Sequence, residues 1–185
     1  MSPMINNNFL KFWFLLAIVT SAMSGLVYLT VQQSLRQSAN DPQIQISEDI
    51  AKTLENGKPV LDFNVPEKTD ISKSLAPYLI IYDKENKPVA GTGVIDNKLP
   101  EMPEGLLQYA RIHGEHSVTW QPRKDIRGAI VIVPYKNGFV VVGKSLREVE
   151  IREKRTFKMS IIAGLITIIT TLVIAILFDR KKNHN

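Results

Sequence analysis

Residues 159–178 read MSIIAGLITIITTLVIAILF, 20 positions without a charged side chain. A helix rises about 1.5 Å per residue, so this stretch can cross a hydrocarbon core of about 30 Å. A second uncharged stretch of 20 residues, FWFLLAIVTSAMSGLVYLTV, covers residues 12–31. The sequence therefore predicts two transmembrane helices with a folded segment between them.

The segment between the spans, residues 32–158, is almost neutral. It contains 19 Lys and Arg against 17 Asp and Glu, a net charge of 19 − 17 = +2, although the whole chain carries +5. Charges of both signs alternate along it, which is typical of a solvated surface and argues against a nucleic-acid-binding stripe. The chain has no cysteine, so the domain has no disulfide and needs its own apolar core.

Two questions about the spans have competing answers. Ala22-Met23-Ser24 resembles a signal-peptide cleavage site, but the apolar run continues through residues 26–29, which favours an uncleaved anchor. Basic residues flank both sides of both spans. The positive-inside rule is weak for loops longer than about 60 residues, so charge alone leaves the orientation open.

Apolar periodicity between the spans predicts an α+β domain. We expect a helix begun by the N-cap Asp41 with Pro42 and ended by Gly57, and a second helix at 103–112 stopped by Gly114. The expected strands are a short one at 60–63, a hairpin of 78–82 with 88–94, and three more at 117–121, 129–134 and 139–143, the last two joined by an Asn137-Gly138 turn. A last helix should begin with a Ser145–Glu148 capping box and run unbroken into the second span.

This order predicts a five-stranded antiparallel sheet with helices packed on one face. The apolar positions of the strands and helices should form its core. The predicted core residues are Ile50, Leu54, Leu79, Ile81, Leu107, Val118, Ile130, Ile132, Val140 and Val142.

Several phrases of this segment resemble a known kind of domain. They are Asp41-Pro42-Gln43, Leu79-Ile80-Ile81-Tyr82-Asp83, Gly105-Leu106-Leu107-Gln108-Tyr109-Ala110, Val118-Thr119-Trp120-Gln121-Pro122, Arg127-Gly128-Ala129 and the run from Val142 to Glu150. With the element order, they resemble the extracytoplasmic PAS-like (Cache-type) sensor domains of bacterial transmembrane receptors. In those receptors the domain lies between two membrane helices, and a long first helix packs on a sheet that binds small ligands.

The resemblance implies a two-span protein of the bacterial inner membrane. Its segments would be a cytoplasmic N-terminus (1–11), a first span (12–31), an extracytoplasmic PAS-like domain (32–158), a second span (159–178) and a cytoplasmic tail (179–185). Receptors of that class continue past the second span into an output domain, whereas the tail here has seven residues. We therefore expect a separate membrane signalling protein to carry any output.

Several side chains are candidates for a ligand site. Tyr78, Tyr82, Tyr109, Trp120 and Tyr135 combine apolar bulk with a polar end, although strand aromatics also fill cores. In a PAS-like fold the basic loop that holds Arg123 and Arg127 edges the ligand cavity, where arginine pairs well with a carboxylate. The predicted small-molecule ligand residues are Tyr82, Tyr109, Trp120, Arg123, Arg127 and Tyr135.

Catalysis and metal binding have little support in the sequence. His113 and His116 are separated by the helix-breaking Gly114 and have no cysteine or third histidine nearby, so we expect no metal site and no cofactor. No combination of nucleophile, base and carboxylate has motif spacing, and no glycine-rich loop precedes a helix, so we expect no enzyme.

Small residues recur four apart in both spans, which allows close helix packing within lipid and self-association. They are Ala17, Ser21 and Gly25 in the first span and Ala163, Thr167, Thr171 and Ala175 in the second. The function expected from these features is a membrane-anchored sensory or ligand-binding module that acts through a partner. The alternative is a non-sensing assembly or scaffold protein that uses the PAS-like domain as a protein-binding surface.

Overall fold

The computed structural model describes residues 7–38 and 40–182, which fall into two compact units. One unit holds most of the helices α1 (Asn7–Ser38) and α4 (Arg147–Lys182), and the other is a folded domain, Leu35–Glu150. Residues 1–6 of the predicted N-terminus, residue 39, and residues 183–185 of the predicted tail lie outside the described residues.

Helices α1 and α4 are long and apolar enough to cross a membrane. They have 32 and 36 residues and contain the two predicted spans. Large apolar side chains such as Phe12 (70% exposed) and Leu26 (62% exposed) lie on their surface, where a soluble helix would carry polar groups. The expectation that α4 continues into the second span without a break is confirmed.

The two long helices contact each other through small and aromatic side chains. Gly164 is buried, and a Cβ atom added to it would lie 3.4 Å from Oγ of Ser24. The rings of Tyr28 and Phe157 meet edge to face with centroids 5.2 Å apart. A small residue at 164 thus lets the backbones approach closely, as is common for helices within lipid.

The predicted small-residue stripes lie only partly in this contact. They are half-buried at Ala17, Thr171 and Ala175 and exposed at Ser21, Gly25, Ala163 and Thr167. Residues spaced four apart are rotated by about 40° around the helix axis from one to the next, because a turn has 3.6 residues. A row with this spacing therefore cannot stay within one straight contact face. The exposed hydroxyls of Ser21 and Thr167 donate to carbonyl oxygens one turn earlier, at 2.8 and 2.9 Å, so neither donor is left unpaired on the helix surface.

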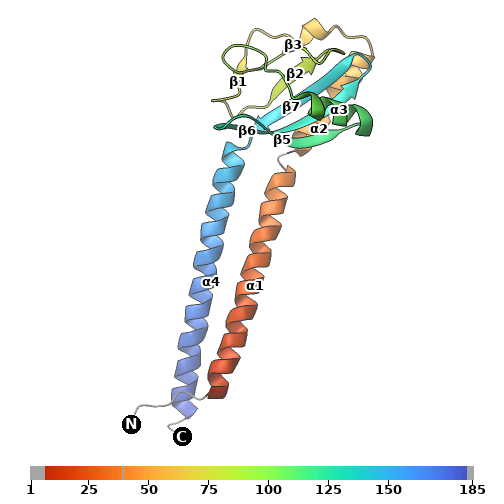
Figure 1. Cartoon of the computed structure of the whole chain (residues 1–185). Coiled ribbons are helices and arrows are strands. Elements are labelled where there is room, and N and C mark those ends of the chain that lie inside the picture. Colours follow the sequence, from red (N-terminus) through yellow and green to blue (C-terminus); the bar gives the residue numbers. More distant parts are fainter. Residues whose placement is uncertain (1–6, 39, 183–185) are drawn as a thin grey trace. The chain divides into compact units, whose positions relative to one another are not determined.

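In the folded domain, one group of strands follows α2 and η1 and a second group follows α3 (Figure 1). Its elements are α2 (Asp41–Glu55), the 3₁₀ helix η1 (Val60–Phe63), β1 (Thr69–Asp70), β2 (Tyr78–Tyr82), β3 (Pro88–Gly91), β4 (Gly93–Val94), α3 (Glu104–His113), β5 (His116–Arg123), β6 (Ile126–Tyr135) and β7 (Gly138–Ser145).

Five strands form an antiparallel sheet, as the sequence predicts, and their order in the sheet is β3-β2-β7-β6-β5. The last strand, β7, is therefore the central one. Residue Val141 pairs with Ile80 of β2 on one side and with Ile132 of β6 on the other. The predicted turn at Asn137-Gly138 joins β6 to β7. A separate pair of two-residue strands, β1 and β4, is parallel and was not predicted.

The helices cover both faces of the sheet, so the prediction of helices on one face is wrong. Strand β7 shows the reason, because its buried side chains alternate between two cores. Phe139 and Val141 lie in the core under α3, whereas Val140 and Val142 lie in the core under α2 and η1. A central strand that is buried on both faces is uniformly apolar. Its sequence therefore has no alternating polar residues that would indicate a solvent-exposed face.

Each predicted core residue lies in one of these two cores. The α3 core contains Leu107, Ile130 and Ile132, with Val118 packed against it, and the α2 core contains Leu54, Ile81, Val140 and Val142, with Ile50 and Leu79 packed against it.

Three local predictions need correction. Residues 60–63 form η1 and not a strand, since Pro59 and two chain-reversing bonds (Asp62 N–H to Pro59 O, Asn64 N–H to Leu61 O) tighten the backbone. Helix α2 has Asn40 and not Asp41 as its N-cap residue. At the start of α4, Ser145 Oγ accepts from the N–H of Arg147 at 3.3 Å, one residue before the bond of a capping box.

Candidate functional site

Two of the predicted ligand residues are inside the α3 core. The Tyr82 side chain is fully buried, and its hydroxyl donates to the carbonyl oxygen of Pro100 at 2.8 Å. Burial, with smaller contributions from Tyr78 and Glu101, raises the pKa of Tyr82 far above its ordinary value. Trp120 is 5% exposed in the same core. Both side chains therefore fill space and stabilise the sheet.

Tyr78 occupies the same core but has an unusual environment. A Cβ atom added at Gly93 or Gly143 would lie closer than 3.0 Å to the Tyr78 side chain, and one added at Gly128 would lie 3.1 Å from its hydroxyl. Among the described residues, the buried hydroxyl has no hydrogen-bond partner. Burial raises the pKa of Tyr78 well above its ordinary value.

The other two predicted aromatic ligand residues lie elsewhere. Tyr135 packs against the α2 core, on the opposite face of the sheet from Tyr82 and Trp120. Burial, with a smaller contribution from Asp83, raises its pKa. Tyr109 is on the surface of α3 and is 47% exposed. The four aromatic side chains therefore do not line one pocket.

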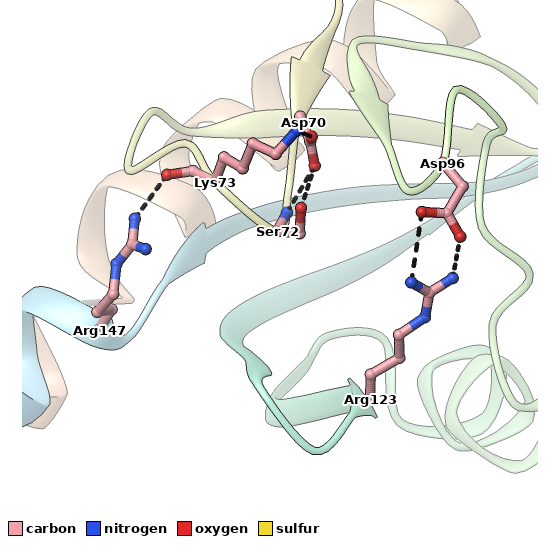
Figure 2. A network of polar contacts seen from close by, with 6 residues as sticks. All are labelled: Asp70, Ser72, Lys73, Asp96, Arg123 and Arg147. Atoms are coloured by element: carbon pink, nitrogen blue, oxygen red, sulfur yellow. Dashed lines mark hydrogen bonds and ion pairs between the residues drawn. The ribbon is translucent and has the colours of Figure 1, made fainter.

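The guanidinium of Arg123 is already paired with a carboxylate (Figure 2). Both of its terminal nitrogens bind Asp96, Nη1 to Oδ1 at 3.4 Å and Nη2 to Oδ2. Hydrogen bonding to Arg123 holds the pKa of Asp96 below its usual value, and the same bond raises the pKa of Arg123. An anionic ligand would have to displace Asp96 from this exposed pair.

Arg127 also has a partner, and this contact leads to α4. Its Nη1 lies 2.9 Å from Oε1 of Glu150, in the first turns of that helix. Its carbonyl oxygen accepts the N–H of Leu146 at 2.9 Å. The start of β6 is thus joined to the start of α4 by an ion pair and a backbone bond.

A third contact joins α4 to the turn that follows β1. Nη2 of Arg147 donates to the carbonyl oxygen of Lys73 at 2.5 Å (Figure 2). Asp70 holds that turn, since its Oδ1 accepts from the N–H and the Oγ of Ser72 at 3.0 and 2.5 Å. These bonds lower the pKa of Asp70. We call the contacts Arg127–Glu150, Leu146–Arg127 and Arg147–Lys73 the α4 clasp.

The clasp was only partly predictable from the sequence. The pattern indicated a helix start at Ser145 and marked Arg127 as a candidate anion ligand. The partner Glu150 is 23 residues away, and no local pattern connects the two positions. The acceptor for Arg147 is a backbone carbonyl 74 residues away, and a carbonyl carries no sequence signature.

The histidines surround Tyr109 instead of converging on an ion. The rings of His113 and His116 lie 4.0 and 4.3 Å from the Tyr109 ring, centroid to centroid. Nδ1 of His113 is 3.0 Å from the carbonyl oxygen of Tyr109. Within residues 7–38 and 40–182, no group of three or more His, Asp or Glu side chains is placed to hold a metal ion.

The α1–α4 pair has a hollow of about 680 Å³ along its length. Its lining is mainly apolar with four hydroxyl side chains, namely Val19, Thr20, Met23, Ser24, Val27, Thr156, Met159, Ser160 and Ala163. A hollow of this composition, between two helices apolar enough to cross a membrane, suits a lipid chain or another helix.

The chain matches no protein-family model, no curated protein and no solved structure.

Proposed function

We propose that the protein is a membrane-anchored sensory module that acts through a partner protein. In this proposal the folded domain is extracytoplasmic, both ends of the chain are cytoplasmic, and the membrane is the bacterial inner membrane. The resemblance to PAS-like (Cache-type) sensor domains supports this topology. The input is a small ligand or a protein contact at the domain, and α4 carries it to the membrane.

The observation that carries the proposal is the α4 clasp together with the continuity of α4. Three contacts hold the start of the helix to β6 and to the β1 turn. From Arg147 onward the helix is unbroken over 36 residues. A hydrogen-bonded helix without Pro or a bulge resists bending, so a shift of the sheet displaces the helix as a rod.

A second candidate is an assembly or scaffold protein whose domain binds another protein. Two observations favour it. The predicted ligand residues are dispersed over both faces of the sheet and its surface, and α3 exposes Tyr109 and Ile112, the latter 76% exposed. In a scaffold the domain needs no mechanical connection to α4, which separates the two candidates.

Hydrogen exchange measured on the full chain in lipid nanodiscs tests the connection. Arg127→Ala removes the ion pair to Glu150, so amide exchange over residues 151–158 should rise severalfold. Arg123→Ala is the matched control, because it also removes an exposed arginine from an ion pair but leaves α4 untouched. Equal exchange over residues 151–158 in the two variants would remove the support for a sensory helix and leave the scaffold candidate.

A further inference from the structure

The five-stranded sheet has two edges of unequal length. At one edge β3 has four residues and includes Pro88. At the other edge β5 has eight residues, and in the described chain it pairs only with β6. An open edge strand presents unpaired backbone groups and pairs readily with another strand unless Pro, charge or a bulge blocks it. Here Pro122 and the irregular pairing after Trp120 protect only the end of β5.

The outward side chains of β5 suit a strand-to-strand contact. Ser117, Thr119 and Gln121 are exposed and uncharged. The neighbouring surface of α3 adds an apolar part, since Tyr109 (47% exposed) and Ile112 (76% exposed) lie there. The ring of Tyr109 contacts the ring of His116, the first residue of β5, with a tilt of 40° between the ring planes. The open edge of β5 and the exposed apolar side chains of α3 are therefore adjacent.

The charges at the two ends of β5 favour a second copy of this chain as the partner. Glu115 precedes the strand and Lys124 follows it, and both are exposed. Arg123, the last residue of the strand, is paired with Asp96 of its own chain and adds less to the basic end. When two copies of such a strand pair antiparallel about a two-fold axis, the acidic end of each meets the basic end of the other. A parallel arrangement would put like charges side by side, which is unfavourable.

We propose that the β5 edge binds the β5 edge of a second copy of this chain, in antiparallel register about Thr119. The two sheets become one sheet of ten strands. In this register Thr119 lies opposite Thr119 and Ser117 opposite Gln121. Glu115 lies opposite Arg123, whose side chain stays paired with Asp96, so Lys124 beside it supplies the opposite charge. Anchoring both copies in one membrane raises their local concentration, so a modest interface is sufficient.

Disulfide formation in the full-length chain in native membranes tests this contact, and the absence of cysteine gives a clean background. Facing residues of antiparallel strands have Cα atoms about 4.5–5.5 Å apart, within disulfide range. Thr119→Cys should therefore form a covalent dimer on mild oxidation. The matched control is Val89→Cys on the β3 edge, at a position 39% exposed, which should give only collisional background.

Charge exchange gives a second, independent readout. In the Thr119→Cys background, Glu115→Lys should lower the rate of crosslinking about fivefold, and adding Lys124→Glu should restore most of it. The proposal is overturned if Thr119→Cys crosslinks no faster than Val89→Cys. It is also overturned if the crosslinked product joins Thr119→Cys to a different protein, since the edge then binds a foreign strand.

Discussion

Tyr78 and Tyr82 lie on the same strand, but their buried hydroxyl groups differ in hydrogen bonding. Tyr82 donates to Pro100 O at 2.8 Å, whereas the Tyr78 hydroxyl is buried without a partner among the described residues. A buried polar group without a hydrogen bond costs free energy, and a bonded one contributes about 1 kcal/mol. Tyr78→Phe should therefore leave the free energy of unfolding unchanged or raise it, while Tyr82→Phe should lower it by about 1 kcal/mol.

Urea unfolding of the two variants, followed by tryptophan fluorescence, measures this difference. Each variant is the control for the other, since both lose one oxygen from one strand. A loss of stability in Tyr78→Phe equal to that in Tyr82→Phe would mean that the Tyr78 hydroxyl has a partner, such as a buried water.

The same two phenols make stability depend on alkaline pH. Burial raises the pKa of both Tyr78 and Tyr82, so the folded domain holds them neutral. Their contribution is fully present below the ordinary tyrosine pKa of about 10 and is lost as the pH rises above it, because the unfolded chain ionises first. We expect the melting temperature to fall above about pH 10.

Spectroscopy separates this effect from ordinary titration. The phenolate absorbance of Tyr78 and Tyr82 should appear together with the loss of far-ultraviolet ellipticity. The double variant Tyr78→Phe/Tyr82→Phe should have a shallower alkaline decline. An unchanged decline in that variant would assign alkaline unfolding to other groups.

At the scale of the element, Gly143 allows strand β7 to pack closely against side chains of the two neighbouring strands. A Cβ atom there would clash with the ring of Tyr78 and lie 2.8 Å from Cγ2 of Ile130. Both neighbours are buried, so the added atom has no free space and the core must deform. Gly143→Ala should cost about 1–3 kcal/mol of unfolding free energy.

Gly105 in the first turn of α3 is the matched control. A Cβ atom there meets nothing within 4 Å. Because alanine favours helix over glycine, Gly105→Ala should be neutral or stabilise by up to about 1 kcal/mol. Thermal unfolding of both variants compares the same chemical change in two environments, and similar losses in both would contradict the tight fit at Gly143.

The elements predicted from the sequence are those with strong local signals. Val140 and Ile132 lie in continuous apolar runs, Asn137-Gly138 marks a hairpin, and Gly114 ends α3 with a φ of +91°. The strands β1 and β4 have two residues each and depend on a pairing 24 residues apart, Thr69 with Gly93. No periodicity can develop over two residues, so only the tertiary contact defines them.

The candidate site was harder to predict because it depends on register across the sheet. Tyr82 and Tyr135 are both aromatic strand residues, yet they face opposite cores. Their side is set by pairing with β7, which begins only at Gly138. Arg123 and Arg127 were predicted in a loop between strands, whereas Arg123 ends β5 and Arg127 lies at the start of β6. Their carboxylate partners are 27 and 23 residues distant.

At the scale of the whole molecule, the proposed topology can be tested with single cysteines in intact cells. Leu61 on η1 is 73% exposed, so Leu61→Cys should react with a membrane-impermeant maleimide. Asn185→Cys, in the proposed cytoplasmic tail, should react only after the membrane is permeabilised. Labelling of the C-terminal cysteine alone in intact cells would reverse the orientation and place the domain in the cytoplasm.

The position of β7 has a consequence for tension. The strand that leads into α4, with only Leu146 between them, is the central strand of the sheet. A force applied to α4 therefore enters the sheet through a strand that is hydrogen-bonded on both sides, to β2 and to β6. An edge strand in this place would be held by one ladder only. Detaching β7 requires breaking two ladders, so this connection between the sheet and α4 resists tension better than an edge strand would.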